Sequence, residues 1–190
     1  EVGPRYRELW DEAHALLDRM VADRSIALRG VYGYLAAAAD GDDIVLNRDG
    51  AEVGRFHMLR QQQQRAEKTT PFASLSDFVA PVGGPADSVG VFAVTAGQGV
   101  AEMVEAYKAD HDDYHAIMTQ ALADRLAEAF TEWLHQKMRA EWGIGDAADV
   151  ELEDLLKGRY QGIRPAFGYP ACPDHTEKGT LFELLEAGRV

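Results

Sequence analysis

A long run, residues 100–140, constrains the fold of this chain more than any other feature. Apolar side chains recur along it at helical spacing, while acidic side chains fall on a different face. The apolar positions are Leu122, Leu126, Ala129, Phe130, Trp133 and Leu134. The pattern predicts one helix over 100–109 that continues, with a bend at an acidic cluster, through 112–140. Gly143 and Gly145 are expected to end this helix.

The segments before this helical half predict β-structure. Residues 29–37 and 44–46 are rich in β-formers and flank the turn sequence at 40–43, which predicts a β-hairpin. Residues 89–95 form a continuous apolar run of strand length and predict a buried central strand. Residues 75–81 are expected to form a short extended segment.

Other segments have helical character. Residues 5–24 show the apolar spacing of an amphipathic helix, and 152–158 and 179–185 predict short helices. The polar stretch 56–66 favours a helix with a solvated face. Three strands and four or five helices in a non-alternating order predict an α+β fold, with an antiparallel central sheet packed against long helices.

Composition excludes several classes of function. At 190 residues, with 46% hydrophobic and 27% charged residues, the chain predicts a single globular domain over 1–190. A net charge of −13 argues against a nucleic-acid partner, and no apolar run approaches the roughly 20 residues of a membrane span. The only cysteine, Cys172, fits a reducing compartment and hence a cytoplasmic location. Because Glu1 is not a Met and a helix begins almost at once, we expect a domain that is incomplete at both ends.

The segment 164–178 is unusual because it holds three prolines and the single cysteine. Proline fixes φ and removes a backbone donor, so this segment predicts a shaped loop and neither a regular helix nor an interior strand. Arg164 presents a rigid fork of donors suited to a carboxylate. The chemistry of the loop alone indicates a site for an anion or a zwitterion.

As a literal string, however, 164–178 is highly specific. Arg-Pro-Ala-Phe-Gly-Tyr-Pro-Ala-Cys-Pro-Asp-His-Thr-Glu-Lys resembles the signature of the activation domain of cobalamin-dependent methionine synthase. Residues 111–118 and 121–130 are similar to the long helix of that family, and 77–81 and 90–95 to its central strands, in the right order. The resemblance therefore covers essentially the whole chain.

The resemblance implies a function that composition does not indicate. The activation domain of that family binds S-adenosylmethionine over a cobalamin held by a neighbouring domain of the same polypeptide. With an electron from flavodoxin or a flavoprotein reductase, it supports reductive methylation of cob(II)alamin to methylcobalamin, which then methylates homocysteine in methionine biosynthesis. The chain is thus expected to be part of a 5-methyltetrahydrofolate–homocysteine methyltransferase and, when isolated, to have no turnover of its own.

The resemblance also assigns ligand-binding residues. Arg164 matches the arginine that holds the ligand carboxylate, and the backbone of Ala166 matches a ligand contact. Tyr169 lies in the same signature and, with Cys172 and His175, is expected mainly to shape the loop. The alternative for Arg164 is a structural arginine that caps the preceding segment. No catalytic residue and no metal ligand are expected in this chain.

Two acidic residues complete the predicted site. Asp124 and Glu128 lie one turn apart and match acidic positions of the family's long helix, where carboxylates attract a sulfonium or ammonium group. The alternative is a solvated acidic stripe, partly paired with Arg125 and Lys137. For docking of an electron donor, a local basic patch is expected among residues close in sequence: Arg55, Arg60, Arg65 and Lys68.

Two other functions stay open at this point. One is a binding or interaction module that derives from this domain and has lost its ligand. The chain departs from the family pattern at Phe167, where the family usually has proline, and this departure is relevant to that alternative. The other is a helical metal-binding protein, since Glu132 and His135 form a Glu-x-x-His pair. A second cluster, at His111, Asp112, Asp113 and His115, suits either a metal or the charged start of a helix.

Overall fold

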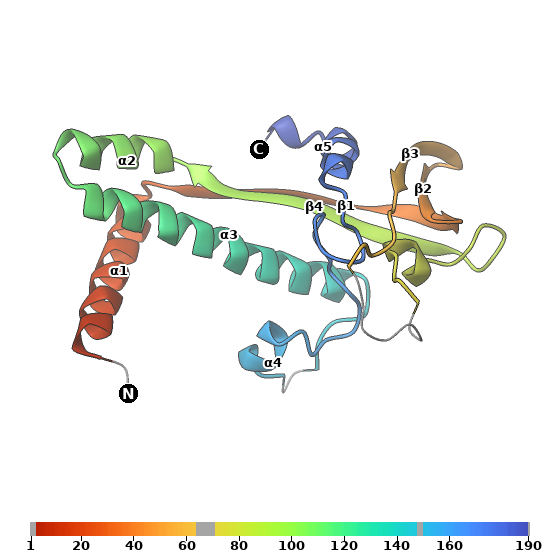
Figure 1. The fold of residues 1–190 in the computed structure, drawn as a ribbon, viewed down its shortest axis with the longest axis horizontal. Coiled ribbons are helices and arrows are strands. Elements are labelled where there is room, and N and C mark those ends of the chain that lie inside the picture. The colour runs from red at the N-terminus through yellow and green to blue at the C-terminus, as the bar shows by residue number, and fades with distance from the viewer. Residues whose placement is uncertain (1–2, 64–70, 148–149, 190) are drawn as a thin grey trace. The chain divides into compact units, whose positions relative to one another are not determined.

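The computed structural model describes residues 3–63, 71–147 and 150–189, and within these ranges it has an α+β fold (Figure 1). The helices are α1 (Pro4–Asp23), α2 (Val100–Ala109), α3 (Asp113–Glu141), α4 (Leu152–Leu156) and α5 (Lys178–Leu185). The strands are β1 (Ala27–Asp40), β2 (Asp43–Arg48), β3 (Ala51–His57) and β4 (Asp87–Gln98). They form one sheet in the order β3-β2-β1-β4. None of the described helices is long and apolar enough to cross a membrane.

The chain divides into two compact units. A helical unit contains Glu1–Gly30 and Val94–Arg159, and a sheet unit contains Val31–Ala93 and Tyr160–Val190. Strands β1 and β4 contribute residues to both units.

The helical unit is organised around α3. Leu16 and Met20 of α1 are almost fully buried and pack with Met118 of α3. The predicted bend between 100–109 and 112–140 is a complete break, because His111 has a φ of 58° and the chain folds back on itself. Helices α2 and α3 consequently lie side by side in Figure 1. Gly143, with a φ of 80°, follows α3 as the sequence predicts.

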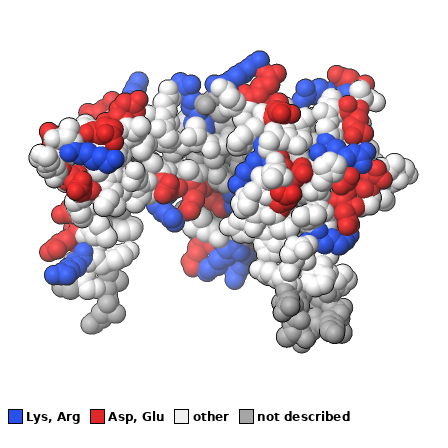
Figure 2. All heavy atoms as spheres, turned by 45° about the horizontal axis from the view of Figure 1, so that its top comes forward, with Lys and Arg blue, Asp and Glu red and all other residues white. Residues whose placement is uncertain are grey.

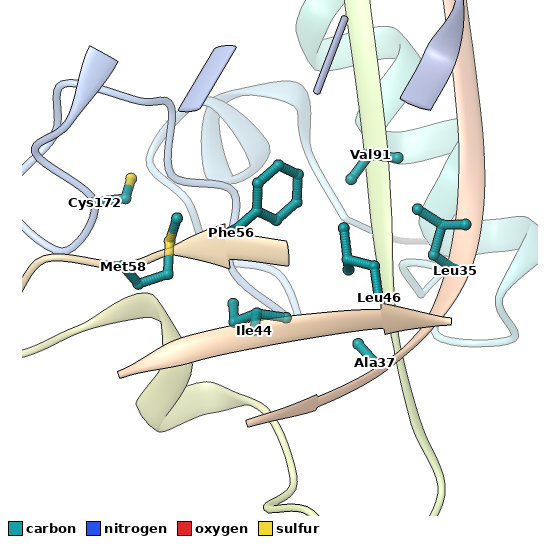
Figure 3. Close-up of a cluster of buried hydrophobic side chains, with 8 residues drawn as sticks. All are labelled: Leu35, Ala37, Ile44, Leu46, Phe56, Met58, Val91 and Cys172. Carbon is teal, nitrogen blue, oxygen red and sulfur yellow. The ribbon is translucent and has the colours of Figure 1, made fainter. Parts of the chain in front are cut away.

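The sheet unit is built on the predicted hairpin. Strands β1 and β2 pair antiparallel, with Ala39 opposite Ile44, and β2 pairs antiparallel with β3, with Ile44 opposite Phe56. The inward side chains form a core drawn in Figure 3, which consists of Leu35, Ala37, Ile44, Leu46, Phe56, Met58, Val91 and Cys172. Burying a Leu, Ile, Phe or Met side chain of this kind contributes about 1.5–3 kcal/mol each, so this core fixes the framework on which the nearby loops rest.

The helix predicted over 56–66 is wrong for its described part. Phe56 and His57 belong to β3, Phe56 is 4% exposed, and residues 58–63 are not helical; 64–66 lie outside the described residues. The physical reason is the turn at Asp49 and Gly50, whose φ values of 53° and 81° suit a two-residue hairpin loop. After that turn the chain runs back antiparallel to β2 and forms β3, a strand that the sequence analysis does not predict.

Two further predictions need correction. Residues 75–78 form a single 3₁₀ turn in place of an extended segment, begun by a capping box in which Ser74 and Asp77 satisfy each other's backbone amides. The apolar run 89–95 does lie in β4, but β4 ends the strand order and is not central. Its apolar composition has another source, since Val91 is buried in the core of the sheet unit and Val89 packs against that core.

Candidate functional site

The loop over 164–178 contains a tight turn closed by its own backbone. Tyr169 N donates to Ala166 O at 3.0 Å, Gly168 N donates to Cys172 O at 2.9 Å, and Cys172 N donates to Tyr169 O at 2.9 Å. The thiol of Cys172 adds a fourth hydrogen bond, from Sγ to Ala166 O at 3.1 Å. The Ala166 carbonyl therefore accepts two hydrogen bonds inside the turn.

Side chains of this turn alternate between the core and the solvent. Phe167 is half-buried and its ring packs on that of Phe56, with 5.5 Å between centroids. Cys172 is 2% exposed and lies in the core near Met58 (Figure 3). Tyr169, in contrast, is 63% exposed. Burial raises the pKa of the Cys172 thiol, which makes this residue a poor nucleophile.

His175 shapes the same loop. Gly168 has a φ of 104°, and a Cβ built on it would overlap the imidazole of His175, so the ring rests on the bare backbone of this glycine. Lys178 Nζ lies 2.9 Å from His175 Nδ1. Asp174 begins the following 3₁₀ turn, because its carboxylate accepts from Thr176 N and Oγ1, and these hydrogen bonds lower its pKa. These contacts agree with the loop-shaping role predicted for His175.

Arg164, Ala166 and Tyr169 come together in this one loop. Arg164 is half-buried and Ala166 is exposed. A hollow of about 290 Å³ lies beside the turn and is lined by Gln62, Gln63, Gly168, Pro170 and Pro173. The two glutamines were missed by sequence reasoning, which treated them as part of a solvated polar run. No local pattern points to them, because the hollow forms only when 62–63 approaches a loop distant in sequence.

Asp124 and Glu128 lie on α3 in the helical unit, whereas the loop residues belong to the sheet unit. Both carboxylates are exposed, one turn apart. Glu128 forms an exposed ion pair with Arg125 at 2.9 Å, with side chains 65% and 72% exposed. This pair agrees with the predicted alternative of a partly paired acidic stripe, and a pair so exposed does not keep Glu128 from a cationic ligand.

Comparison with known proteins identifies the family. Residues 1–190 match the model of the family "Vitamin B12 dependent methionine synthase, activation domain". The chain belongs to this family. A crystal structure of the MetH reactivation domain bound to AdoHcy is similar to it, with 45% sequence identity and a TM-score of 0.90. The match covers 97% of this chain and 58% of that one, so the chain spans less than two thirds of the reactivation domain it matches.

The residues behind the metal-binding alternative have other partners in the described part of the chain. Within 3–63, 71–147 and 150–189, no three His, Cys, Asp or Glu side chains gather as metal ligands would. His135 is buried and its Nδ1 lies 2.8 Å from Arg139 Nη1, while Arg139 forms a buried ion pair with Asp146. Asp112 caps α3, because its carboxylate accepts from His115 N at 3.0 Å and contacts His115 Nδ1 at 2.7 Å. The first of these bonds is the main reason that the pKa of Asp112 is lowered.

Of the basic patch expected in this activation domain, the structure describes Arg55 and Arg60, and both are paired with carboxylates. Arg55 contacts the carboxylates of Asp40, Asp43 and Glu52, while the guanidinium of Arg60 is held by Asp42 and Asp77. Arg65 and Lys68 lie outside the described residues. Figure 2 likewise shows acidic and basic side chains interleaved over the face in view. Each of the two arginines is therefore neutralised locally by more than one carboxylate.

Proposed function

We propose that this chain is the S-adenosylmethionine-binding part of a reactivation domain in a cobalamin-dependent methionine synthase, a methyltransferase of methionine biosynthesis. Both compact units are taken to act as one activation domain. The observation that carries the proposal is the loop at 164–169, in which Arg164 is half-buried while Ala166 and Tyr169 are exposed. The likeness to a reactivation domain bound to AdoHcy, at 45% identity, supports it.

The loop residues suit the chemistry of an S-adenosyl ligand. The guanidinium of Arg164 can donate two parallel hydrogen bonds to the amino-acid carboxylate. Because Ala166 O already accepts two hydrogen bonds, the backbone group that Ala166 offers a ligand is its N–H. The exposed ring of Tyr169 provides a flat surface on which a purine base can stack.

Asp124 and Glu128 match acidic positions of the family's long helix, and they are proposed to attract a cationic group. Their carboxylates stand on one face of α3 and attract a sulfonium or ammonium group through space. Exposure in water weakens each such interaction, so each of the two carboxylates is proposed to supply only a weak attraction. Neither carboxylate is proposed to exchange a proton with the ligand.

The remaining partners follow from the proposed role. When bound, S-adenosylmethionine supplies the methyl group that, with one electron from a reduced flavoprotein, converts cob(II)alamin to methylcobalamin. Cobalamin would be held by a neighbouring domain of the same polypeptide, and the electron donor would be flavodoxin or a flavoprotein reductase. Since flavodoxins are acidic and this chain carries −13, long-range attraction does not favour their encounter. Arg55 and Arg60 are already paired with carboxylates, so we propose that docking depends on short-range contacts.

Calorimetry with S-adenosylmethionine tests the proposal. The full-length polypeptide should bind the ligand, and Arg164→Ala should weaken binding at least tenfold, because a charge-assisted bidentate contact is lost. Arg159→Ala is the matched control, since Arg159 lies five positions earlier and is 68% exposed in a pair with Asp154. Absence of binding by the folded wild-type protein would favour the interaction-module alternative. Equal losses for both variants would assign Arg164 no specific role.

A further inference from the structure

The turn that presents the proposed ligand contacts is attached to the sheet unit through two side chains, Phe167 and Cys172. Phe167 packs on Phe56, which is 4% exposed, so the ring contact reaches the core. Cys172 is 2% exposed and belongs to the same core. Between these two anchors the chain turns outward and exposes Tyr169. The outward residues are thus held at a fixed position relative to the sheet.

Cys172 also forms a hydrogen bond within the turn. Its thiol donates to Ala166 O, the same carbonyl that accepts from Tyr169 N. The side chain thereby links the two arms of the turn, and it fixes the peptide plane of Ala166. The arm at Ala171 is tied in turn to the 3₁₀ segment, because Leu75 N donates to Ala171 O at 2.8 Å.

We infer that Cys172 and Phe167 are positioning residues for the ligand-holding turn: they touch no ligand but hold the Ala166 backbone and the Tyr169 ring in a binding-ready arrangement. The inference rests on the proposed function. A binding loop that is ordered before the ligand arrives avoids the entropy cost of being ordered by it. A substitution that removes the core contact of Phe167 or Cys172 should therefore weaken ligand binding, even though both side chains face the core.

Three substitutions at Cys172 separate positioning from simple packing. Cys172→Ser keeps a donor for Ala166 O, Cys172→Val keeps apolar volume without a donor, and Cys172→Ala keeps neither. If the thiol positions the turn, binding of S-adenosylhomocysteine to the full-length protein should be close to wild type for Ser and about fivefold weaker for Val and Ala. Stability should rank differently, because Cys172→Val keeps apolar volume in the core, whereas Cys172→Ser replaces sulfur with a smaller atom and leaves part of that volume unfilled. Opposite orders of affinity and stability are the expected signature.

Phe167 provides a second, independent test. Phe167→Leu keeps an apolar side chain but loses the ring contact with Phe56, and ligand binding should again weaken several-fold. Phe182→Leu is the matched control in the same unit, because Phe182 is 50% exposed on α5. Wild-type affinity for Phe167→Leu and for all three Cys172 variants would overturn the inference.

Hydrogen exchange keeps the inference testable if a variant does not fold. In the ligand-free wild-type protein, the amides of Gly168, Tyr169 and Cys172 should exchange at least tenfold more slowly than an open-loop amide, because each donates within the turn. Fast exchange of all three would refute a preformed turn whatever the variants show. If the wild-type protein bound no S-adenosylhomocysteine but protected these amides, the proposed function would fail and the preformed turn would stand.

Discussion

Gly168 tolerates a side chain less well than the other glycine compared with it below, Gly83. Its φ of 104° lies beyond the left-handed region that L-residues tolerate, and a Cβ there would overlap Cε1 and Nε2 of His175. Gly168→Ala therefore has two separate costs. Backbone strain costs about 1–3 kcal/mol, and displacement of the imidazole, with loss of its contact to Lys178, costs about 1 kcal/mol more. The expected total is about 2–4 kcal/mol.

Gly83 supplies a control in the same unit. Its φ is 80°, yet a Cβ added to it meets nothing within 4 Å. Gly83→Ala should therefore cost only the backbone term, about 1–2 kcal/mol. Urea unfolding of the two variants measures the difference, provided that the slope of the transition with denaturant is unchanged.

A double substitution isolates the clash at Gly168. If His175 is the obstacle, adding His175→Ala to Gly168→Ala should recover about 1 kcal/mol, whereas His175→Ala should not rescue Gly83→Ala. The reasoning is refuted if Gly168→Ala is no more destabilising than Gly83→Ala. It is also refuted if His175→Ala gives no recovery, because the ring would then not occupy the space beside Gly168.

Two further predictions concern charged residues. Asp146→Ala removes one partner of a buried ion pair, in which the Arg139 and Asp146 side chains are 4% and 8% exposed. The variant should lower the free energy of unfolding by about 3–5 kcal/mol, measured by urea unfolding. Glu153→Ala, in an exposed pair with Lys157, is the control and should change it by less than about 1 kcal/mol. The hydrogen bonds from Arg60 lower the pKa of Asp77 in the folded state. The ionised Asp77 carboxylate therefore stabilises the fold above the unfolded-state pKa of about 3.9, and this contribution is lost as pH falls through the lower folded-state pKa. The stability difference between wild type and Asp77→Asn, followed by urea unfolding from pH 7 to pH 2, should accordingly shrink below about pH 4, and a constant difference would contradict this assignment.

Features of the fold that depend on local patterns could be predicted from the sequence. The spacing of Leu16 and Met20 predicted α1, and the turn at 40–43 predicted the first hairpin, because helical and hairpin signals are encoded within a few residues. Strand β3 was missed because the two-residue turn at Asp49 and Gly50 was not recognised. The edge position of β4 was missed for a different reason: Val91 of β4 is buried in the core, so this edge strand has the apolar composition of a central one.

The site was predicted in a similarly uneven way. The signature string predicted Arg164, Ala166 and Tyr169 as ligand contacts, and all three lie in one loop, where their role stays a prediction. The anchoring role of Phe167 was not predicted, because its partner Phe56 lies on a strand that the sequence had assigned to a helix. Gln62 and Gln63 escaped notice because their place beside the turn is set by tertiary packing. In the same way, the carboxylates that neutralise Arg55 and Arg60 become neighbours only through the pairing of β1, β2 and β3 and the capping box at Ser74.

The loop at 164–169 is proposed to hold the carboxylate group of an S-adenosyl ligand. A crystal structure of the full-length protein with S-adenosylhomocysteine tests this most directly. The account predicts that both carboxylate oxygens of the ligand lie within about 3 Å of the guanidinium nitrogens of Arg164 and that the purine lies against Tyr169. A ligand bound away from this loop, or one whose carboxylate points away from Arg164, would contradict it.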